Sequence, residues 1–267
     1  MTTAPPPRFE PMTIGAVLDT TLRLYGQNFF LMLGLTALPY VPYLVFLLSI
    51  TVLMPQITSP LLNNASLARI LILVVGLIPL VILPLVTYPL SAGAATYAIS
   101  QRYLRHQTSA GEALKAAWQR YGTMAGATIM VGIIMLLATL LLVVPGILCG
   151  LSYALLYPVI MLEARHATES RQRSWELVAG FRGKIFKVFL VIGLLCGLIN
   201  IGVKAILDMA LDPNTLSGEL VVQVVTQSVA LVLTPLATIA GVLLYYDLRI
   251  RKEGFDLEML SRAFSTR

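Results

Sequence analysis

Long apolar runs separated by short charged islands dominate the pattern of the chain. A helix needs about 20 apolar residues to cross a hydrocarbon core of about 30 Å, because each residue rises 1.5 Å. Five runs reach that length with few or no charges: Phe29–Met54, Ile70–Gln101, Tyr121–Leu162, Ile185–Ile206 and Leu220–Tyr246. The pattern therefore predicts an all-α, polytopic membrane protein.

The third run is too long for a single helix across a membrane. It contains Val144-Pro145-Gly146, which is a turn signal. We expect one span over Gly122–Val144 and a tight return over Pro145–Leu162. The chain then has six transmembrane helices, which pair along the sequence as three hairpins.

A short amphipathic segment precedes each predicted hairpin. The first begins at Thr13, the second opens with the capping box Ser109-x-x-Glu112, and the third shares Arg-His-x-Thr with the second, at 165–168 and 105–108. Four residues of the first segment also recur 96 positions later in the second. Gly15, Leu18, Tyr25 and Gly26 align with Gly111, Leu114, Tyr121 and Gly122. Convergence under shared membrane constraints explains the apolar stripes but not the Arg-His-x-Thr motif.

These matches predict three copies of one unit, an interfacial helix on the cytoplasmic side followed by a membrane hairpin. The units cover about 13–104, 105–164 and 165–258 of a single membrane domain. Residues 1–12 are expected to form a disordered N-terminal tail, and residues 259–267 a C-terminal cytoplasmic tail.

The basic residues in the connecting segments predict the orientation. Counted on alternate sides of the six spans, 17 Lys and Arg residues fall on one side and 2 on the other. Because cytoplasmic loops carry the excess of basic residues, both termini are expected in the cytoplasm. The Pro-rich segment Met1–Pro11 lacks the apolar core of a signal peptide, so we expect no cleaved leader.

Composition supports the membrane class and excludes others. Hydrophobic residues make up 57% of the 267 residues, charged residues only 12%, and the mean hydropathy is +0.83. The net charge of +6 lies in islands between apolar runs rather than on a basic surface, which argues against nucleic acid as a partner. Cys149 and Cys196 both lie inside apolar runs, so they predict neither a disulfide framework nor a zinc site.

No chemistry of an enzyme is visible in the sequence. Ionisable residues are absent from the interior of the predicted spans, where they usually mark function. We therefore assign no catalytic, metal-binding or cofactor-binding residue and expect no cofactor. The sequence is compatible with an enzyme only if the fold places four residues in one interfacial cluster, namely Glu163, His106, His166 and Asp247.

Basic residues beside amphipathic segments have a clearer physical role. Cations near the membrane surface attract anionic lipid headgroups at roughly 1 kcal/mol each. The candidate headgroup contacts are Arg171, Arg173, Arg182, Lys184 and Lys187 around the third amphipathic segment, and Arg249 and Arg251 after the last span. Enforcement of topology is the alternative role for the same residues. The expected partners are anionic membrane lipids, and a protein partner or a second copy of the chain remains open.

The end of the last span resembles a known family. It reads Leu-Tyr-Tyr-Asp-Leu-Arg-Ile-Arg-Lys-Glu-Gly-Phe-Asp-Leu-Glu over residues 244–258. Together with Ile14-Gly15, Pro145-Gly146 and Ser174-Trp175, this stretch is similar to the membrane domain attached to some bacterial glycerophosphoryl diester phosphodiesterases, which also occurs as a stand-alone six-helix protein. The resemblance implies the bacterial cytoplasmic (inner) membrane. It does not imply phosphodiesterase activity, because the hydrolase of that family is a separate soluble domain.

Two classes of function remain after these exclusions. The leading one is a non-catalytic integral membrane protein that organises or handles lipids or partner proteins at the cytoplasmic leaflet. The alternative is a transporter or channel for a small neutral or apolar solute, which prolines inside the spans, such as Pro79, Pro84 and Pro89, favour. That alternative requires a cavity between the spans.

Overall fold

The computed structural model describes residues 11–57, 66–104, 106–212 and 215–254. All regular structure in these residues is helical, which confirms the predicted all-α class. The described helices are α1 (Ile14–Gln27), α2 (Phe29–Ile57), α3 (Ser66–Tyr103), α4 (Ala110–Gln119), α5 (Tyr121–Leu141), α6 (Val143–Ser152), α7 (Leu156–Glu163), α8 (Ala167–Val178), α9 (Arg182–Ala210) and α10 (Leu216–Glu253).

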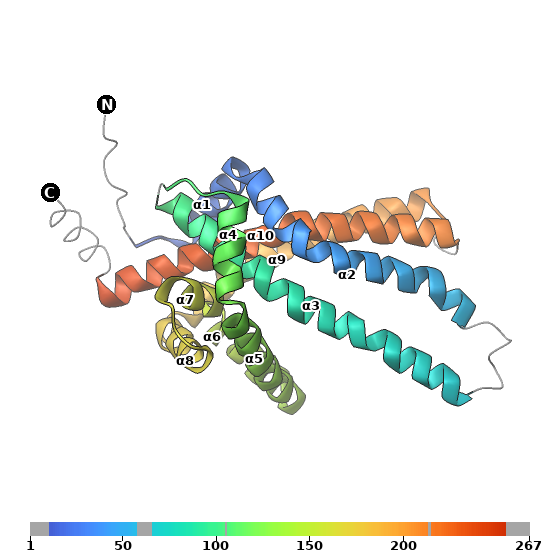
Figure 1. Ribbon diagram of the computed structural model, residues 1–267. Helices are drawn as coiled ribbons and strands as arrows, with labels where there is room; N and C mark the ends of the chain where they lie inside the picture. Colours follow the sequence, from blue (N-terminus) through green and yellow to red (C-terminus); the bar gives the residue numbers. More distant parts are fainter. Residues whose placement is uncertain (1–10, 58–65, 105, 213–214, 255–267) are drawn as a thin grey trace.

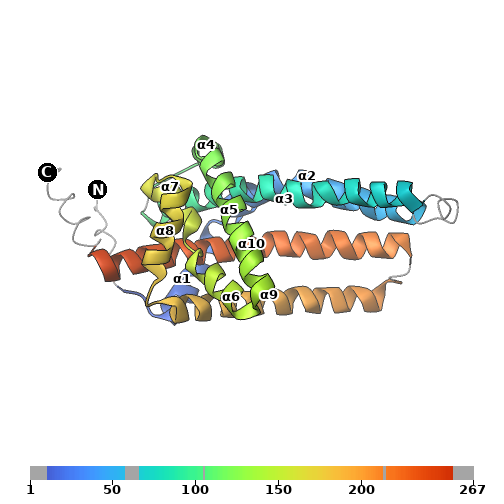
Figure 2. The ribbon, with the colours of Figure 1, turned by 90° about the horizontal axis from the view of Figure 1, so that it is seen from below.

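Six helical segments of the described chain are long and apolar enough to cross a membrane, as the sequence predicted. They pair as α2 with α3, α5 with the broken span α6–α7, and α9 with α10. The short helices α1, α4 and α8 each precede one hairpin, and they lie together at one end of the molecule (Figures 1 and 2). We call this the capped end, and the opposite end of the long helices the far end.

Side-chain caps form at the predicted starts of two of the short helices, Thr13 and Ser109. The Thr13 hydroxyl accepts a hydrogen bond from the Ala16 amide. At α4 the capping box is complete, because the Glu112 amide donates to Ser109 Oγ at 3.3 Å and the Ser109 amide donates to Glu112 Oε2 at 3.0 Å. The bond from the Ser109 backbone, and one from the Thr108 hydroxyl, lower the pKa of the Glu112 carboxyl because they favour its charged form.

The turn of the second hairpin lies two residues before the predicted place. Leu142 has an extended backbone between α5 and α6, so Pro145 is the third residue of α6 rather than part of the turn. A proline is tolerated there because the first amides of a helix have no partner within the helix. The return to the capped end is also not one helix, since residues 153–155 interrupt it between α6 and α7.

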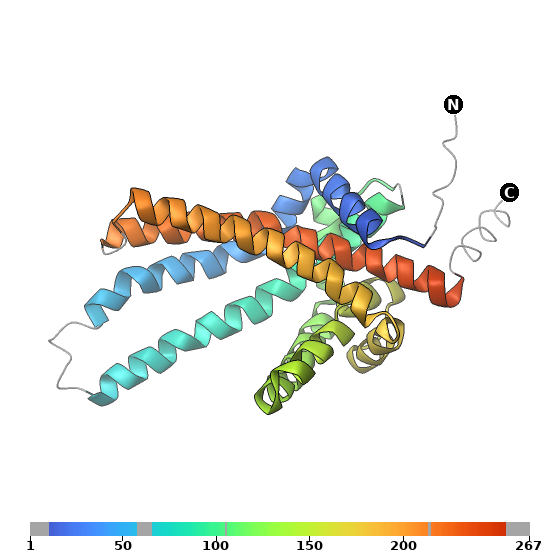
Figure 3. The same ribbon diagram turned by 180° about the vertical axis from the view of Figure 1, so that it is seen from behind.

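The core of the fold is concentrated at the capped half of α10. Every residue from Ile239 to Leu248 is buried. The helices that contact α10 are α1, α2, α3, α7, α8 and α9. Towards the far end the helices expose large apolar side chains, among them Leu198, Ile201 and Met209 of α9. The second hairpin also leaves the direction of the other two and points away from them (Figures 1 and 3). Its exposed Leu140, Leu141 and neighbours suit a lipid environment.

Candidate functional site

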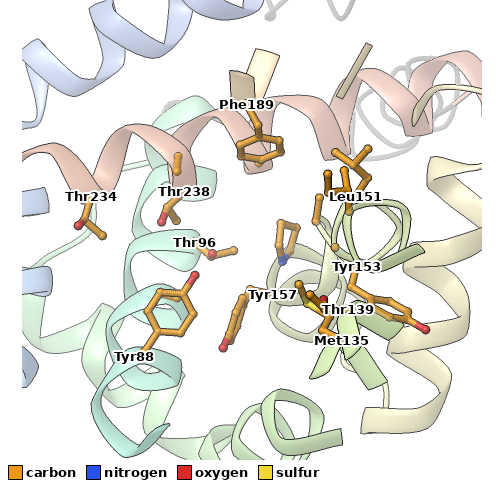
Figure 4. Close-up of a pocket in the computed structure, with 18 of the residues that line it drawn as sticks. Tyr88, Thr96, Met135, Thr139, Leu151, Tyr153, Tyr157, Phe189, Thr234 and Thr238 are labelled. Carbon is orange, nitrogen blue, oxygen red and sulfur yellow. The ribbon is translucent and has the colours of Figure 1, made fainter. Parts of the chain in front are cut away.

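A cavity of about 560 Å³ lies where the second hairpin meets the rest of the bundle. Its walls come from α3, α5, α6, α7, α9 and α10, and no charged residue is among those that line it. This volume is in the range of small-molecule binding sites in proteins. Figure 4 shows Tyr88, Thr96 and Thr238 around the cavity, with Phe189 directed toward it. Sequence reasoning did not single out these residues.

The interruption between α6 and α7 forms one wall of the cavity. Pro158 lies in the first turn of α7, where it has no amide to donate to the carbonyl of Ala154 and its ring would clash with that carbonyl in a continuous helix. The interruption at residues 153–155 lies directly before this turn, and both Ala154 and Pro158 line the cavity. The Ala154 carbonyl faces α10 at Gly241, where an added Cβ would lie 3.8 Å from the carbonyl oxygen.

The opposite wall is a close approach of α6 to α5. An added Cβ on Gly146 would lie 2.2 Å from Thr139 Oγ1, and one on Gly150 would lie 3.1 Å from Met135 Cε. The sequence contains this pair at four-residue spacing, a pattern that allows helices to pack closely. The pairs Gly122/Gly126 and Gly193/Gly197 share the spacing, but an added Cβ on these glycines would meet nothing within 4 Å.

The hydroxyl of Thr96 is buried in the cavity wall without a hydrogen-bond partner among the described residues. A threonine in a helix usually donates to the carbonyl four residues earlier. Thr36, Thr128 and Thr234 of this chain do so, at 3.0, 2.8 and 2.8 Å. Thr96 is therefore the exception among the buried threonines of the described chain, since its hydroxyl lies in the cavity wall without a partner.

Three tyrosines at the cavity differ in what their hydroxyls contact. The Tyr157 hydroxyl is 2.7 Å from Thr128 Oγ1, and the Tyr153 hydroxyl accepts a bond from Arg171 at 3.3 Å. The Tyr88 ring stands edge-on to the Tyr157 ring at 5.6 Å, and its hydroxyl has no hydrogen bond within the described part of the chain. The phenol of Tyr88 thus adds a second free polar group.

The cavity is open at the level of the membrane spans. Tyr88 is 51% exposed and Ile147 is 48% exposed, although both line the cavity. Tyr88 lies within the apolar span Ile78–Tyr103, so the cavity is exposed beside a residue of a candidate span. Thr96 lies about 10 Å along the helix axis from Tyr103, the last residue of α3. The cavity is therefore nearer to the capped end than to the far end.

An ion-pair network surrounds Glu163 at the capped end. The Glu163 carboxylate accepts from Arg173 at 3.0 Å and from Arg165 at 2.8 Å, and Tyr245 donates to it at 3.2 Å. Arg173 also pairs with Glu253. Burial lowers the pKa of the Arg173 guanidinium, but its hydrogen bonds to Glu163 and Glu253 outweigh that effect and raise the pKa above its ordinary value. Arg173 is therefore a permanent cation shared by two carboxylates.

A second polar cluster surrounds Asp247 on α10, whose side chain is completely buried. Lys184 of α9 donates to its carboxylate at 2.5 Å and Arg251 at 3.1 Å. The Met12 amide donates to the same carboxylate at 2.6 Å, while Lys184 and Arg251 donate to the Met12 carbonyl at 2.7 and 2.9 Å. Met12, the last residue of the predicted disordered N-terminal tail, is therefore bound into this cluster, and residues 1–10 of that tail lie outside the described chain.

The cations predicted to contact lipid headgroups have several different surroundings. Arg173, Lys184 and Arg251 belong to the two clusters above, and Arg249 pairs with Glu253 at 3.0 Å. Arg182 lies over the Trp175 ring at 4.5 Å. Lys187 is exposed and has no partner among the described residues. Arg171 donates to Tyr153, so it links α8 to the interruption beside the cavity. Headgroup binding by these residues stays a prediction, in competition with intramolecular pairing for most of them.

The four residues named as a condition for an enzyme do not meet in one cluster. Glu163 and Asp247 belong to separate networks, His106 is bonded to Gln101 at 3.1 Å, and His166 precedes α8. Among the described residues there is no group of three or more His, Cys, Asp or Glu side chains that could hold a metal ion.

Six apolar spans with short helices at one end define a multi-pass α-helical membrane protein. Comparisons with protein-family models, curated proteins and solved structures gave no match to the chain. The resemblance of residues 244–258 to the phosphodiesterase-associated membrane domain therefore stays a prediction.

Proposed function

We propose that this membrane protein is non-catalytic and handles lipids at the cytoplasmic leaflet of a bacterial inner membrane. The cavity beside the second hairpin carries the proposal, because it opens at the level of the spans. A molecule in it can enter from the bilayer without crossing water. The excess of basic residues on the predicted inner side supports a cytoplasmic location for the capped end.

The lining favours the apolar part of a lipid over an ion or a charged solute. Burying a charge in an apolar site is expensive unless it is paired, and no charged residue lines the cavity to pair with one. The cations at the capped end are mostly held by carboxylates of the same chain. They support attraction of anionic headgroups only through the remaining exposed side chains, of which Lys187 is one.

The test is native mass spectrometry of the protein extracted gently from its own membrane, with Ala237→Phe compared to the parent. Ala237 is exposed in the middle of α10 because it faces the cavity, so a phenyl ring there fills the space. We expect a stoichiometric lipid on the parent protein and its loss from the variant. Ala205→Phe on α9 is the control, since Ala205 is also exposed but does not line the cavity. Equal lipid content in all three proteins contradicts the proposal.

A transporter or channel for a small neutral or apolar solute is the second candidate. The interruption between α6 and α7 favours it, because broken helices beside a cavity are common in transporters. Reconstituted vesicles distinguish the two functions. Accelerated flux of a neutral solute that Ala237→Phe abolishes supports transport, whereas bound lipid without flux supports lipid handling.

A further inference from the structure

We infer that the cavity selects an uncharged amphipathic molecule, such as a diglyceride or a long-chain alcohol, whose polar oxygen pairs with the Thr96 hydroxyl. This inference rests on the proposed function and names the ligand class of the same cavity. Its basis is one buried polar atom that the protein leaves without a partner.

Leaving a buried hydroxyl unpaired destabilises the folded protein, because the group loses its hydrogen bonds to water and gains none in return. The chain avoids that cost at other buried threonines, since Thr21 and Thr36 donate to carbonyls of their own helices at 2.7 and 3.0 Å. Thr96 could reach the carbonyl of Ala92 in the same way, but it does not. A ligand oxygen at this point would give the Thr96 hydroxyl its missing hydrogen-bond partner. That hydrogen bond would then contribute to the free energy of binding.

The polar groups of the cavity define a direction for the ligand. Tyr88, Ala92 and Thr96 recur every four residues, and all three line the cavity. Thr96 lies about 12 Å further along α3 than Tyr88, toward the capped end, and is fully buried where Tyr88 is half exposed. The polar oxygen of the ligand therefore lies at Thr96, and its chain leads past Tyr88 to the opening.

The absence of charge in the lining sets the chemical class. Threonine and tyrosine hydroxyls are the polar side-chain groups of the lining, among them those of Thr96, Thr238 and Tyr88, and the remaining wall is mostly aliphatic or aromatic. A phosphate or ammonium group in this space would be buried without a counter-ion. A hydroxyl or ester oxygen requires only one hydrogen bond, which Thr96 supplies.

The test uses the purified full chain in detergent, titrated with a diglyceride and with a phosphatidylglycerol of the same acyl chains. Binding is measured by native mass spectrometry for the parent, Thr96→Val, Thr96→Ser and Thr226→Val. Thr226 is the matched control because its hydroxyl is bonded to the Val222 carbonyl at 2.7 Å and lies away from the cavity. We expect Thr96→Val to weaken diglyceride binding about tenfold, as loss of one hydrogen bond predicts, and Thr96→Ser to retain it.

A second measurement separates this role from a structural one. Thr96→Val replaces an unpaired buried hydroxyl by a methyl group of the same shape, so the ligand-free variant should melt at the same or a higher temperature than the parent. Diglyceride binding that Thr96→Val leaves unchanged, or preference for the phosphatidylglycerol, overturns the inference while the proposed lipid handling stands. Failure of the parent to bind either lipid overturns both.

Discussion

The second and third hairpins carry a proline in their returning span, but only the second hairpin is broken there. Pro235 lies inside the continuous helix α10. Pro158 lies in the first turn of α7, and the interruption at residues 153–155 comes directly before it. At the continuous site, the Tyr25 hydroxyl of α1 donates to the Val232 carbonyl at 2.5 Å. The carbonyl that Pro235 leaves without an amide is that of Leu231, so α1 bonds the carbonyl next to it.

The difference shows that a proline does not by itself interrupt these spans, and α3 of the first hairpin is also continuous with Pro79, Pro84 and Pro89 inside it. A freed carbonyl in a membrane must find a donor within the protein. The third hairpin packs against α1 along its capped half, whereas the second hairpin points away from the bundle (Figure 3). The interruption in the second hairpin lines the cavity. The hairpin that points away from the bundle therefore forms part of the candidate site.

The largest expected effect is at the anchor of the third hairpin. Replacing Asp247 by alanine leaves Lys184 and Arg251 without their shared carboxylate and releases the Met12 amide. Breaking a buried ion pair by removing one partner costs about 3–5 kcal/mol. We expect Asp247→Ala to lower the free energy of unfolding in detergent by that amount, or to prevent recovery of folded protein.

The control for this prediction is an ion pair at the other end of the same hairpin. Asp208 pairs with Lys204 at 2.6 Å, and the lysine side chain is 58% exposed. Exposed pairs contribute about 0–1 kcal/mol, so Asp208→Ala should have a small effect. Equal losses for Asp247→Ala and Asp208→Ala would contradict the view that the third hairpin is anchored at its capped end.

A smaller effect is expected inside the second hairpin. Alanine at Gly146 would place its Cβ 2.2 Å from Thr139 Oγ1 and 3.1 Å from Thr139 Cα, and the second of these is a backbone atom that cannot rotate away. Overpacking of this kind costs about 1–3 kcal/mol. Thermal unfolding in detergent checks the loss, with Gly193→Ala as the control because an added Cβ there meets nothing within 4 Å. A Gly146→Ala protein as stable as the control would show that α5 and α6 separate easily.

The sequence predicts the helices of this fold much better than its site. The six spans and the caps at Thr13 and Ser109 follow from hydrophobic length and local hydrogen bonding, which act over a few residues. The cavity depends on contacts between helices far apart in the chain. Gly146 was visible as part of a turn signal, but its close contact with Thr139 depends on which helix lies opposite. Nothing local marks Thr96, because its unpaired hydroxyl is apparent only when every possible partner has a position.

The smallest of the effects tests the continuous proline site directly. Tyr25→Phe removes the hydroxyl that donates to the Val232 carbonyl, which should cost about 1 kcal/mol of unfolding free energy. Burial raises the pKa of the Tyr25 phenol above its ordinary value of 10.0, so the phenol remains a neutral donor in alkaline buffer. The difference in unfolding free energy between parent and variant should therefore be the same at pH 7 and at pH 9.

Tyr43→Phe is the control, since the Tyr43 hydroxyl has no hydrogen bond in the described part of the chain. If Tyr25→Phe were as neutral as this control, the hydrogen bond between α1 and α10 beside Pro235 would not contribute to stability.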